Sequence, residues 1–217
     1  MSKGKRKVEI FNKKLLVEGN DDKHVVLALC KKCGIPETFN IIDTGGIDKL
    51  KEEISVRFKQ SGINTIGILI DADVDVVARW ESIKVILESI NFDIPKTLPK
   101  EGLILESNNK RVGVWIMPNN EAKGMLEDFI YFLAPKNDAL FPIAEAILID
   151  IEAKGLDRYK AVHRSKALIA TWLAWQEDPG TPMGLSITKK ILDTESPECQ
   201  SFVDWLKKLF RTSDMYN

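Results

Sequence analysis

Short apolar runs alternate with longer segments of helical periodicity along the chain. The run NTIGILI at 64–70 is apolar without alternation, which is typical of a strand buried on both faces. Between the runs, apolar positions recur with the period of a helix. Strands that alternate with helices indicate βαβ units and a mainly parallel sheet. Four strands are expected, at residues 13–18, 40–43, 64–70 and 111–117.

Helical patterns fill the second half of the chain, at 125–133, 139–153, 163–177 and 199–210. We therefore expect an α/β fold in which a mainly parallel central sheet of about four strands is flanked by helices. The expected core spans residues 8–135. Residues 136–217 are expected to form a helical C-terminal extension that packs on this core as one compact unit.

Aromatic residues are frequent in the C-terminal helices. Base stacking is one use for such side chains. However, Trp172 and Trp175 share one helical face with apolar neighbours, and Phe202 and Trp205 share another. This periodicity favours core packing.

Composition narrows the class of protein only slightly. Lys and Arg total 31 against 32 for Asp and Glu, so the net charge is -1. This balance does not indicate nucleic-acid binding, although a local basic face can coexist with it. The basic segment 1–14 lacks the apolar stretch of a signal peptide, and no segment is apolar enough for a membrane span. A cytoplasmic protein without membrane contact is expected.

The cysteines include a C-K-K-C sequence at 30–33 with the spacing of a zinc knuckle. A zinc site needs about four ligands, usually with a second such pair, and none follows. Because Cys30 belongs to an apolar helical pattern, we interpret it as a small core residue.

Acidic residues follow two of the expected strands. The first strand ends in Val17-Glu18-Gly19, and the third ends in the sequence DADVD at 71–75. Ligands of parallel α/β sheets bind at the carboxyl ends of the strands. If the two strands are neighbours, their carboxylates would repel one another unless a divalent cation neutralised them. Oxygen ligands suit Mg²⁺ or Mn²⁺.

Each acid also has a structural interpretation. Asp21 and Asp22 stand where the next helix begins, and helix capping is the interpretation that we prefer for both. The DADVD segment could be a solvated turn that caps the following helix. The combination of two acidic strand ends is more specific than either one alone.

The sequences LLVEGNDD at 15–22 and ILIDADVD at 68–75 resemble the two motifs of the Toprim domain, which is shared by topoisomerases, primases, recombination-mediator proteins and OLD-type nucleases. The resemblance implies that Glu18 is a general acid/base or metal ligand. It implies that Asp71 and Asp73 bind Mg²⁺, with Asp75 as an additional acid.

The resemblance is greatest to the OLD-type nucleases, or to a small stand-alone prokaryotic group with a Toprim-like layout. A TGG turn at 44–46 resembles the glycine turn of that branch. Glu127 and Asp128 in an LED sequence would hold or orient a second cation. Lys166 would be a second catalytic residue besides Glu18, and Arg164 and Lys166 would contact a nucleic-acid backbone. Ordinary helix acids and a solvated lysine remain the alternative.

The function that this resemblance implies is phosphodiester hydrolysis or nicking of nucleic acid, DNA more than RNA, with Mg²⁺ or Mn²⁺ as cofactor. No tyrosine is placed for a covalent topoisomerase step, which favours hydrolysis. No GxxxxGK[ST] sequence occurs, so an ATPase partner would be a separate chain. The alternative is a non-catalytic binding or recruitment module in DNA repair, recombination or phage defence. The oligomeric state stays open.

Overall fold

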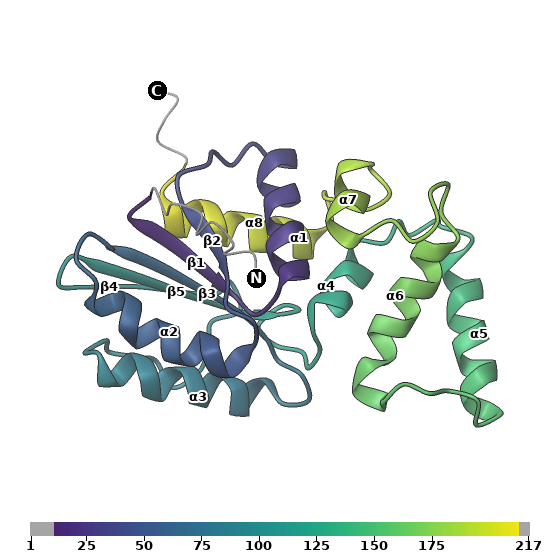
Figure 1. The fold of residues 1–217 in the computed structure, drawn as a ribbon, viewed down its shortest axis with the longest axis horizontal. Coiled ribbons are helices and arrows are strands. Elements are labelled where there is room, and N and C mark those ends of the chain that lie inside the picture. The colour runs from purple at the N-terminus through teal and green to yellow at the C-terminus, as the bar shows by residue number, and fades with distance from the viewer. Residues whose placement is uncertain (1–10, 213–217) are drawn as a thin grey trace, which may run out of the picture.

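A five-stranded sheet organises residues 11–212, the part of the chain that the computed structural model describes (Figure 1). Residues 8–10 of the expected core and most of the basic segment 1–14 lie outside the described residues. The strands are β1 (Lys13–Val17), β2 (Asn40–Asp43), β3 (Thr65–Asp71), β4 (Leu103–Ser107) and β5 (Lys110–Met117). The helices are α1 (Asn20–Lys32), α2 (Ile47–Lys59), α3 (Val76–Ser89), α4 (Leu126–Phe132), α5 (Phe141–Ala153), α6 (Arg164–Ala174), α7 (Met183–Thr188) and α8 (Pro197–Phe210), with a 3₁₀ turn η1 (Ala161–His163).

The strands lie in the order β2-β1-β3-β5-β4. All neighbouring pairs are parallel except β4 and β5, which are antiparallel. The expected mainly parallel α/β fold is therefore confirmed. β1 and β3 are direct neighbours, with Val17 opposite Leu69. The two acidic strand ends consequently share one edge of the sheet.

The expectation of about four strands was one short, because β4 was missed. This strand forms the edge of the sheet, its side chains are mostly half-buried, and its sequence LILES has a shorter apolar run than β3. A hairpin turn joins it to β5 through Asn108 and Asn109, whose φ angles are 49° and 60°. Asparagine is favoured at such positions, and the NN pair was the available signal.

Helices cover both faces of the sheet, which explains the apolar sequence of β3. Ile66 and Ile68 pack with the side chains of α2 and α3 on one face. Leu69 points to the other face, where α1 and α8 lie (Figure 1). Both faces of β3 are therefore buried, as the run of apolar residues predicted.

Helix α8 lies directly on two glycines of the sheet. Gly67 of β3 is opposite Gly113 of β5. A Cβ atom at Gly67 would lie 2.9 Å from Leu209 Cδ2, and one at Gly113 would lie 2.7 Å from that atom. Because neither residue has a side chain, α8 approaches the strands closely. Part of the expected C-terminal extension is thus a layer of the core.

The aromatic residues of the C-terminal helices are mainly core residues, as the periodicity indicated. Trp172 and Phe202 are fully buried, and Trp205 is 1% exposed. Trp175 departs from the expectation, since it is 38% exposed at the end of α6. Helices α5 and α6 pair with each other beyond the sheet (Figure 1). Within residues 11–212, no helix combines the length and hydrophobicity needed to cross a membrane.

Candidate carboxylate site

Glu18 and Asp71 meet at the carboxyl edge of β1 and β3. Glu18 Oε1 accepts a hydrogen bond from the Asp71 backbone N–H at 2.8 Å. The TGG turn holds the Glu18 backbone from the other side, because Gly46 N donates to Glu18 O at 2.7 Å. Gly46 has a φ of 117°, which favours glycine. The side chain of Glu18 is therefore held by the end of β3, and its backbone by the turn that follows β2.

Asp71 has a buried carboxyl oxygen that lacks a partner. Its Oδ1 atom has no hydrogen bond among the described residues. Burial raises the pKa of Asp71 well above its usual value, and the charges of Asp22, Glu18 and Glu127 raise it further. An unpartnered buried oxygen among other acids is unfavourable for a free-standing carboxylate.

Asp22 joins the same group from the first turn of α1. Its Oδ2 atom accepts from Gly19 N at 3.0 Å, so the preferred capping role is present. The side chain is also buried, and burial raises its pKa to about 7, with further contributions from the charges of Glu18 and Glu127. The burial of Asp22 was not predicted, because the sequence does not reveal which capping acid is buried.

Glu127 and Lys166 complete the group. Glu127 is 5% exposed at the start of α4, and its Oε1 atom lies 3.2 Å from Lys166 Nζ of α6. Partial burial opposes the charge of Lys166, but Glu127, Asp21 and Asp71 outweigh it and raise the lysine pKa. Lys166 therefore stays protonated beside the acids. We refer to Glu18, Asp22, Asp71 and Glu127 as the carboxylate cluster.

Burial also raises the pKa of Glu18, where the backbone hydrogen bond from Asp71 and the charge of Arg79 act in the opposite direction. The pKa values of Glu18, Asp22 and Asp71 are thus all raised. Their common cause is the loss of water around several negative charges.

Asp73 and Asp75 follow Asp71 in the chain, and both already have partners within the protein. Asp73 forms an ion pair with Arg79, and both line a hollow of about 230 Å³. Asp75 accepts from Val77 N and Ala78 N, each at 3.0 Å, and so caps α3. Capping was the alternative left open for the DADVD segment. The pairing with Arg79 was missed, although Arg79 lies one turn into the helix.

Asp128 is bound within the protein on both of its oxygens. Oδ2 accepts from Met125 N at 2.8 Å, and Oδ1 accepts from the Ser165 hydroxyl. A Cβ atom at Gly124 would lie 2.6 Å from Asp128 Oδ2, so the glycine makes room for this carboxylate. Arg164 pairs with Glu152 at 2.8 Å. The nucleic-acid role predicted for Arg164 stays a prediction.

The three cysteines lie near one another in the core. Burial raises the pKa of Cys30 and Cys199 to about 12, and Cys33 adds to both shifts. The metal-free thiols of Cys30 and Cys199 are therefore protonated at neutral pH. The interpretation of Cys30 as a core residue agrees with its 8% exposure.

The cluster does not present a complete set of protein ligands for a metal ion. Within the described residues, no group of three or more His, Cys, Asp or Glu side chains could hold one as placed. Mg²⁺ commonly uses one or two carboxylates and fills its octahedron with water and phosphate oxygens. The unpartnered Asp71 Oδ1 and the oxygen-only donors fit such a cation.

Comparison with known proteins gave one family and several solved structures. Residues 12–211 match the family described as "Protein of unknown function (DUF3226)". No curated protein matches significantly. The C-terminal region of the Xanthomonas campestris pv. campestris OLD protein is 13% identical with a TM-score of 0.47, covering 95% of this chain and 98% of that one. The C-terminal region of the Burkholderia pseudomallei OLD protein is 14% identical with a TM-score of 0.41, covering 94% and 95%.

Proposed function

The chain belongs to the family described as "Protein of unknown function (DUF3226)", and we propose that its carboxylate cluster is a Toprim-type site that binds Mg²⁺ or Mn²⁺ and hydrolyses phosphodiester bonds in nucleic acid. The observation that carries the proposal is the Asp71 Oδ1 atom, which is buried without a partner. It lies among acids that raise its pKa. A divalent cation satisfies this oxygen and offsets the repulsion between the acids.

Glu18 and Asp71 are the residues that would hold the cation. Both belong to neighbouring strand ends, and Glu18 has a second oxygen besides the one that accepts from Asp71 N. Asp75 and Asp128 are the weaker candidates, because their oxygens already accept hydrogen bonds from the chain. When bound, the cation supplies charge neutralisation for a phosphate group and for the oxygens around it.

The remaining residues act on the substrate and its proton. Burial raises the pKa of Glu18 in the metal-free protein, and a bound cation would lower it again, so that the carboxylate can accept a proton from water. Lys166 stays charged. Its side chain is 57% exposed, and its ammonium group lies beside the carboxylate of Glu127. Its ammonium group stabilises negative charge that builds up on a phosphate. Together these groups support hydrolysis rather than simple binding.

A nicking assay with supercoiled plasmid tests the proposal. Wild-type protein with Mg²⁺ or Mn²⁺ is expected to convert plasmid to the nicked form, and chelation should stop the reaction. Glu18→Gln and Asp71→Asn should each lower the rate at least about a hundredfold. Asp43→Asn is the matched control, because Asp43 ends β2 at the same sheet edge and is exposed. Equal cleavage by wild type and Glu18→Gln would refute the proposal.

Lys166 gives a second prediction. Lys166→Gln removes the positive charge beside Glu127, and we expect a fall in cleavage rate of about a hundredfold, whereas Lys166→Arg should retain most activity. Lys154→Gln on α5 is the control for loss of a surface lysine. Unchanged cleavage by Lys166→Gln would remove Lys166 from the site.

A non-catalytic binding module is the second candidate. Some acids near the cluster already have partners within the protein, which favours this module: Asp73 forms an ion pair with Arg79, and Asp128 accepts a hydrogen bond from Ser165. Calorimetric titration with Mn²⁺ separates the two functions. Binding that is lost in Asp71→Asn supports the metal site, and absence of binding by the wild type supports the module.

A further inference from the structure

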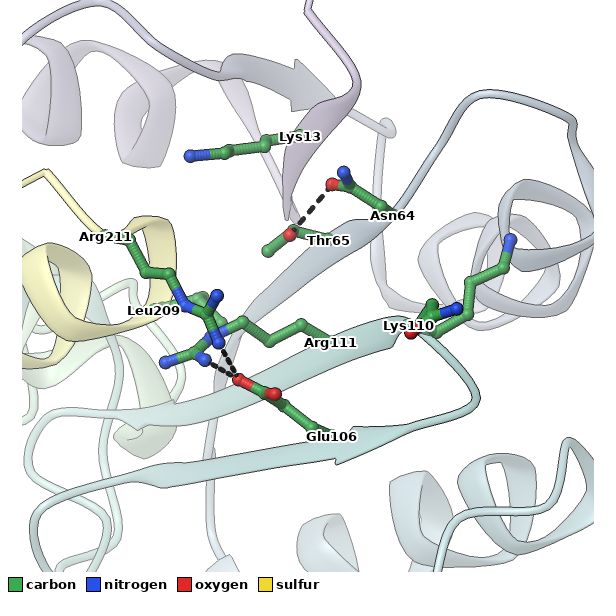
Figure 2. A pocket seen from close by; sticks show the side chains of 9 residues that line it. Lys13, Asn64, Thr65, Glu106, Lys110, Arg111, Leu209 and Arg211 are labelled. Atoms are coloured by element: carbon green, nitrogen blue, oxygen red, sulfur yellow. Dashed lines mark hydrogen bonds and ion pairs between the residues drawn. The ribbon is translucent and has the colours of Figure 1, made fainter.

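A second polar site lies at the opposite edge of the sheet. The amino ends of β1, β3 and β5 border a pocket of about 320 Å³ (Figure 2). β3 has seven residues, so this pocket is about 20 Å from the carboxylate cluster along the strand. The two sites therefore belong to different surfaces of the molecule.

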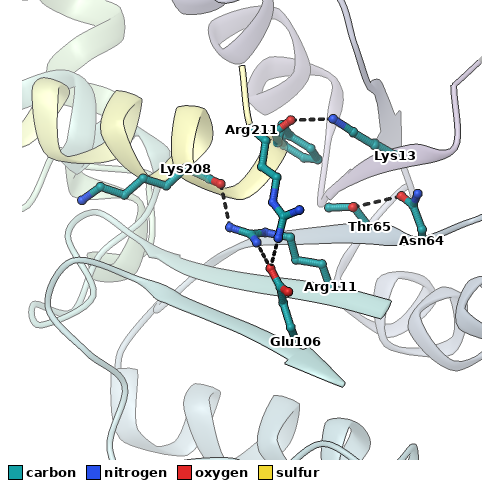
Figure 3. Close-up of polar contacts among 8 residues, drawn as sticks. Lys13, Asn64, Thr65, Glu106, Arg111, Lys208 and Arg211 are labelled. Carbon is teal, nitrogen blue, oxygen red and sulfur yellow. Dashed lines mark hydrogen bonds and ion pairs between the residues drawn. The ribbon is translucent and has the colours of Figure 1, made fainter. Parts of the chain in front are cut away.

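Positive charge gathers in this pocket. Lys13 of β1, Arg111 of β5 and Arg211 at the end of α8 all line it. Both arginines pair with the same carboxylate, that of Glu106 (Figures 2 and 3). Lys110 lines the pocket as well, so among the described residues four cations and one acid line it, and positive charge is in excess there.

Helix α8 explains part of this arrangement. The carboxyl end of a helix attracts cations, and its last carbonyls need donors. Lys13 Nζ donates to Phe210 O at 2.6 Å, and Arg111 Nη2 donates to Lys208 O at 2.8 Å (Figure 3). A purely structural role would account for these two bonds.

Two further observations are not explained by capping of α8. Arg111 Nε is buried without a hydrogen-bond partner among the described residues. Arg211 follows the helix with a φ of 50°, and its side chain is 61% exposed, yet it reaches back to Glu106 at the pocket. Burial and the charge of Arg211 lower the pKa of both Lys13 and Arg111, so the cations repel one another. An anion would relieve this repulsion.

We propose that the pocket binds the phosphate group of a small phosphorylated molecule, through the guanidinium groups of Arg111 and Arg211 with Lys13 beside them. Guanidinium groups match the geometry of phosphate oxygens, and a dianion balances the excess charge. The Thr65 hydroxyl and the Asn64 side chain lie on the same wall (Figure 2). The volume is at the lower end for a small-molecule site, which favours a mononucleotide or orthophosphate over a polymer.

Calorimetric titration of the full chain tests this proposal. Inorganic phosphate and adenosine monophosphate are the two probes, at neutral pH and low salt. Wild type should bind one equivalent, and Arg211→Gln should weaken binding at least about tenfold. Arg158→Gln is the matched control, because Arg158 is exposed and distant in sequence from the pocket residues. Because the Arg211 side chain is 61% exposed, Arg211→Gln should fold like wild type, and circular dichroism checks this.

The outcomes separate the sources of phosphate. Tighter binding of adenosine monophosphate indicates a nucleotide, and equal binding indicates that phosphate alone is recognised; both support the site. The proposal is overturned if neither probe binds, if Arg211→Gln binds like wild type, or if duplex DNA alone binds in an Arg211-dependent way. Glu18→Gln should bind phosphate normally, so the result is independent of the carboxylate cluster.

Discussion

Asp22 combines two roles that work against each other. Its carboxylate caps α1, which favours the ionised form, but its burial beside Glu18 and Glu127 favours the protonated form. The second effect is larger, because the pKa rises from 3.8 to about 7. Ionising Asp22 in the folded protein therefore lowers stability. The free-energy penalty is absent below pH 3.8, grows between pH 3.8 and about 7, and is constant above.

Replacing Asp22 by asparagine should remove this penalty. In chelator-treated protein at pH 8, we expect Asp22→Asn to raise the free energy of unfolding by roughly 2–4 kcal/mol, since three pKa units correspond to about 4 kcal/mol. At pH 4 the gain should nearly vanish. Urea denaturation at the two pH values measures the difference.

Asp21 provides the control for this measurement. It occupies the adjacent position in the first turn of α1 but is exposed, so Asp21→Asn should change stability little at either pH. The same gain for Asp22→Asn at pH 4 and pH 8 would contradict the electrostatic explanation.

The position of helix α8 depends directly on the two glycines beneath it, which have no side chains. Leu209 packs over Gly67 and Gly113, and Trp205 also approaches Gly113. Leu209 is fully buried and has little freedom to move aside. Close packing of this kind makes even one added methyl group unfavourable.

Gly113→Ala should therefore destabilise the protein by about 1–3 kcal/mol, because the new Cβ would lie 2.7 Å from Leu209 Cδ2. Chemical denaturation measures the loss. In the Leu209→Ala background the same change should be less harmful, since the two Leu209 atoms nearest the new Cβ are gone and only Trp205 remains close. Equal losses in the two backgrounds would show that α8 does not press on Gly113.

The elements that sequence predicts best are those with local signals. The apolar run of β3 predicted a strand buried on both faces, whereas the adjacency of β1 and β3 was only a condition for the site, which the strand order meets. β4 was missed, since the apolar run of this half-buried edge strand is only three residues long. The position of α8 depends on contacts between residues about a hundred positions apart, such as Trp205 Nε1 with Leu103 O, and no local pattern encodes them.

The candidate site, like the fold, was predicted only where the sequence carries a local signal. Glu18 and Asp71 have a local signal, since acids directly follow strands. The burial of Asp22, the ion pair of Arg79 and the hydroxyl of Ser165 arise from helices that fold back on the sheet edge. The roles predicted for Asp73 and Lys166 stay predictions, although both lie near the cluster.

For the molecule as a whole, a cation at the carboxylate cluster would join β1 to β3 and favour the folded state. At a hundredfold excess over Kd, binding adds about 2.7 kcal/mol. We expect Mn²⁺ to raise Tm by about 5–10 °C at pH 8 and by less at pH 5, because protons compete with the cation for acids whose pKa values are raised, Asp22 to about 7.

Differential scanning calorimetry with and without Mn²⁺ measures this shift. Asp71→Asn should have a higher Tm than wild type without metal, because one buried charge is removed, and should gain little from Mn²⁺. A metal-induced shift that persists in Asp71→Asn would place the binding elsewhere.

The strands have acids at their carboxyl ends and a group of cations at their amino ends. A net charge of -1 conceals this separation, which gives the molecule an electric dipole along the strand direction. Near a polyanion, the torque on this dipole would turn the cationic end forward and the acidic end away. If DNA is the substrate, as proposed, encounters at low ionic strength would begin with the cationic end, and moderate salt would aid approach of the carboxylate cluster.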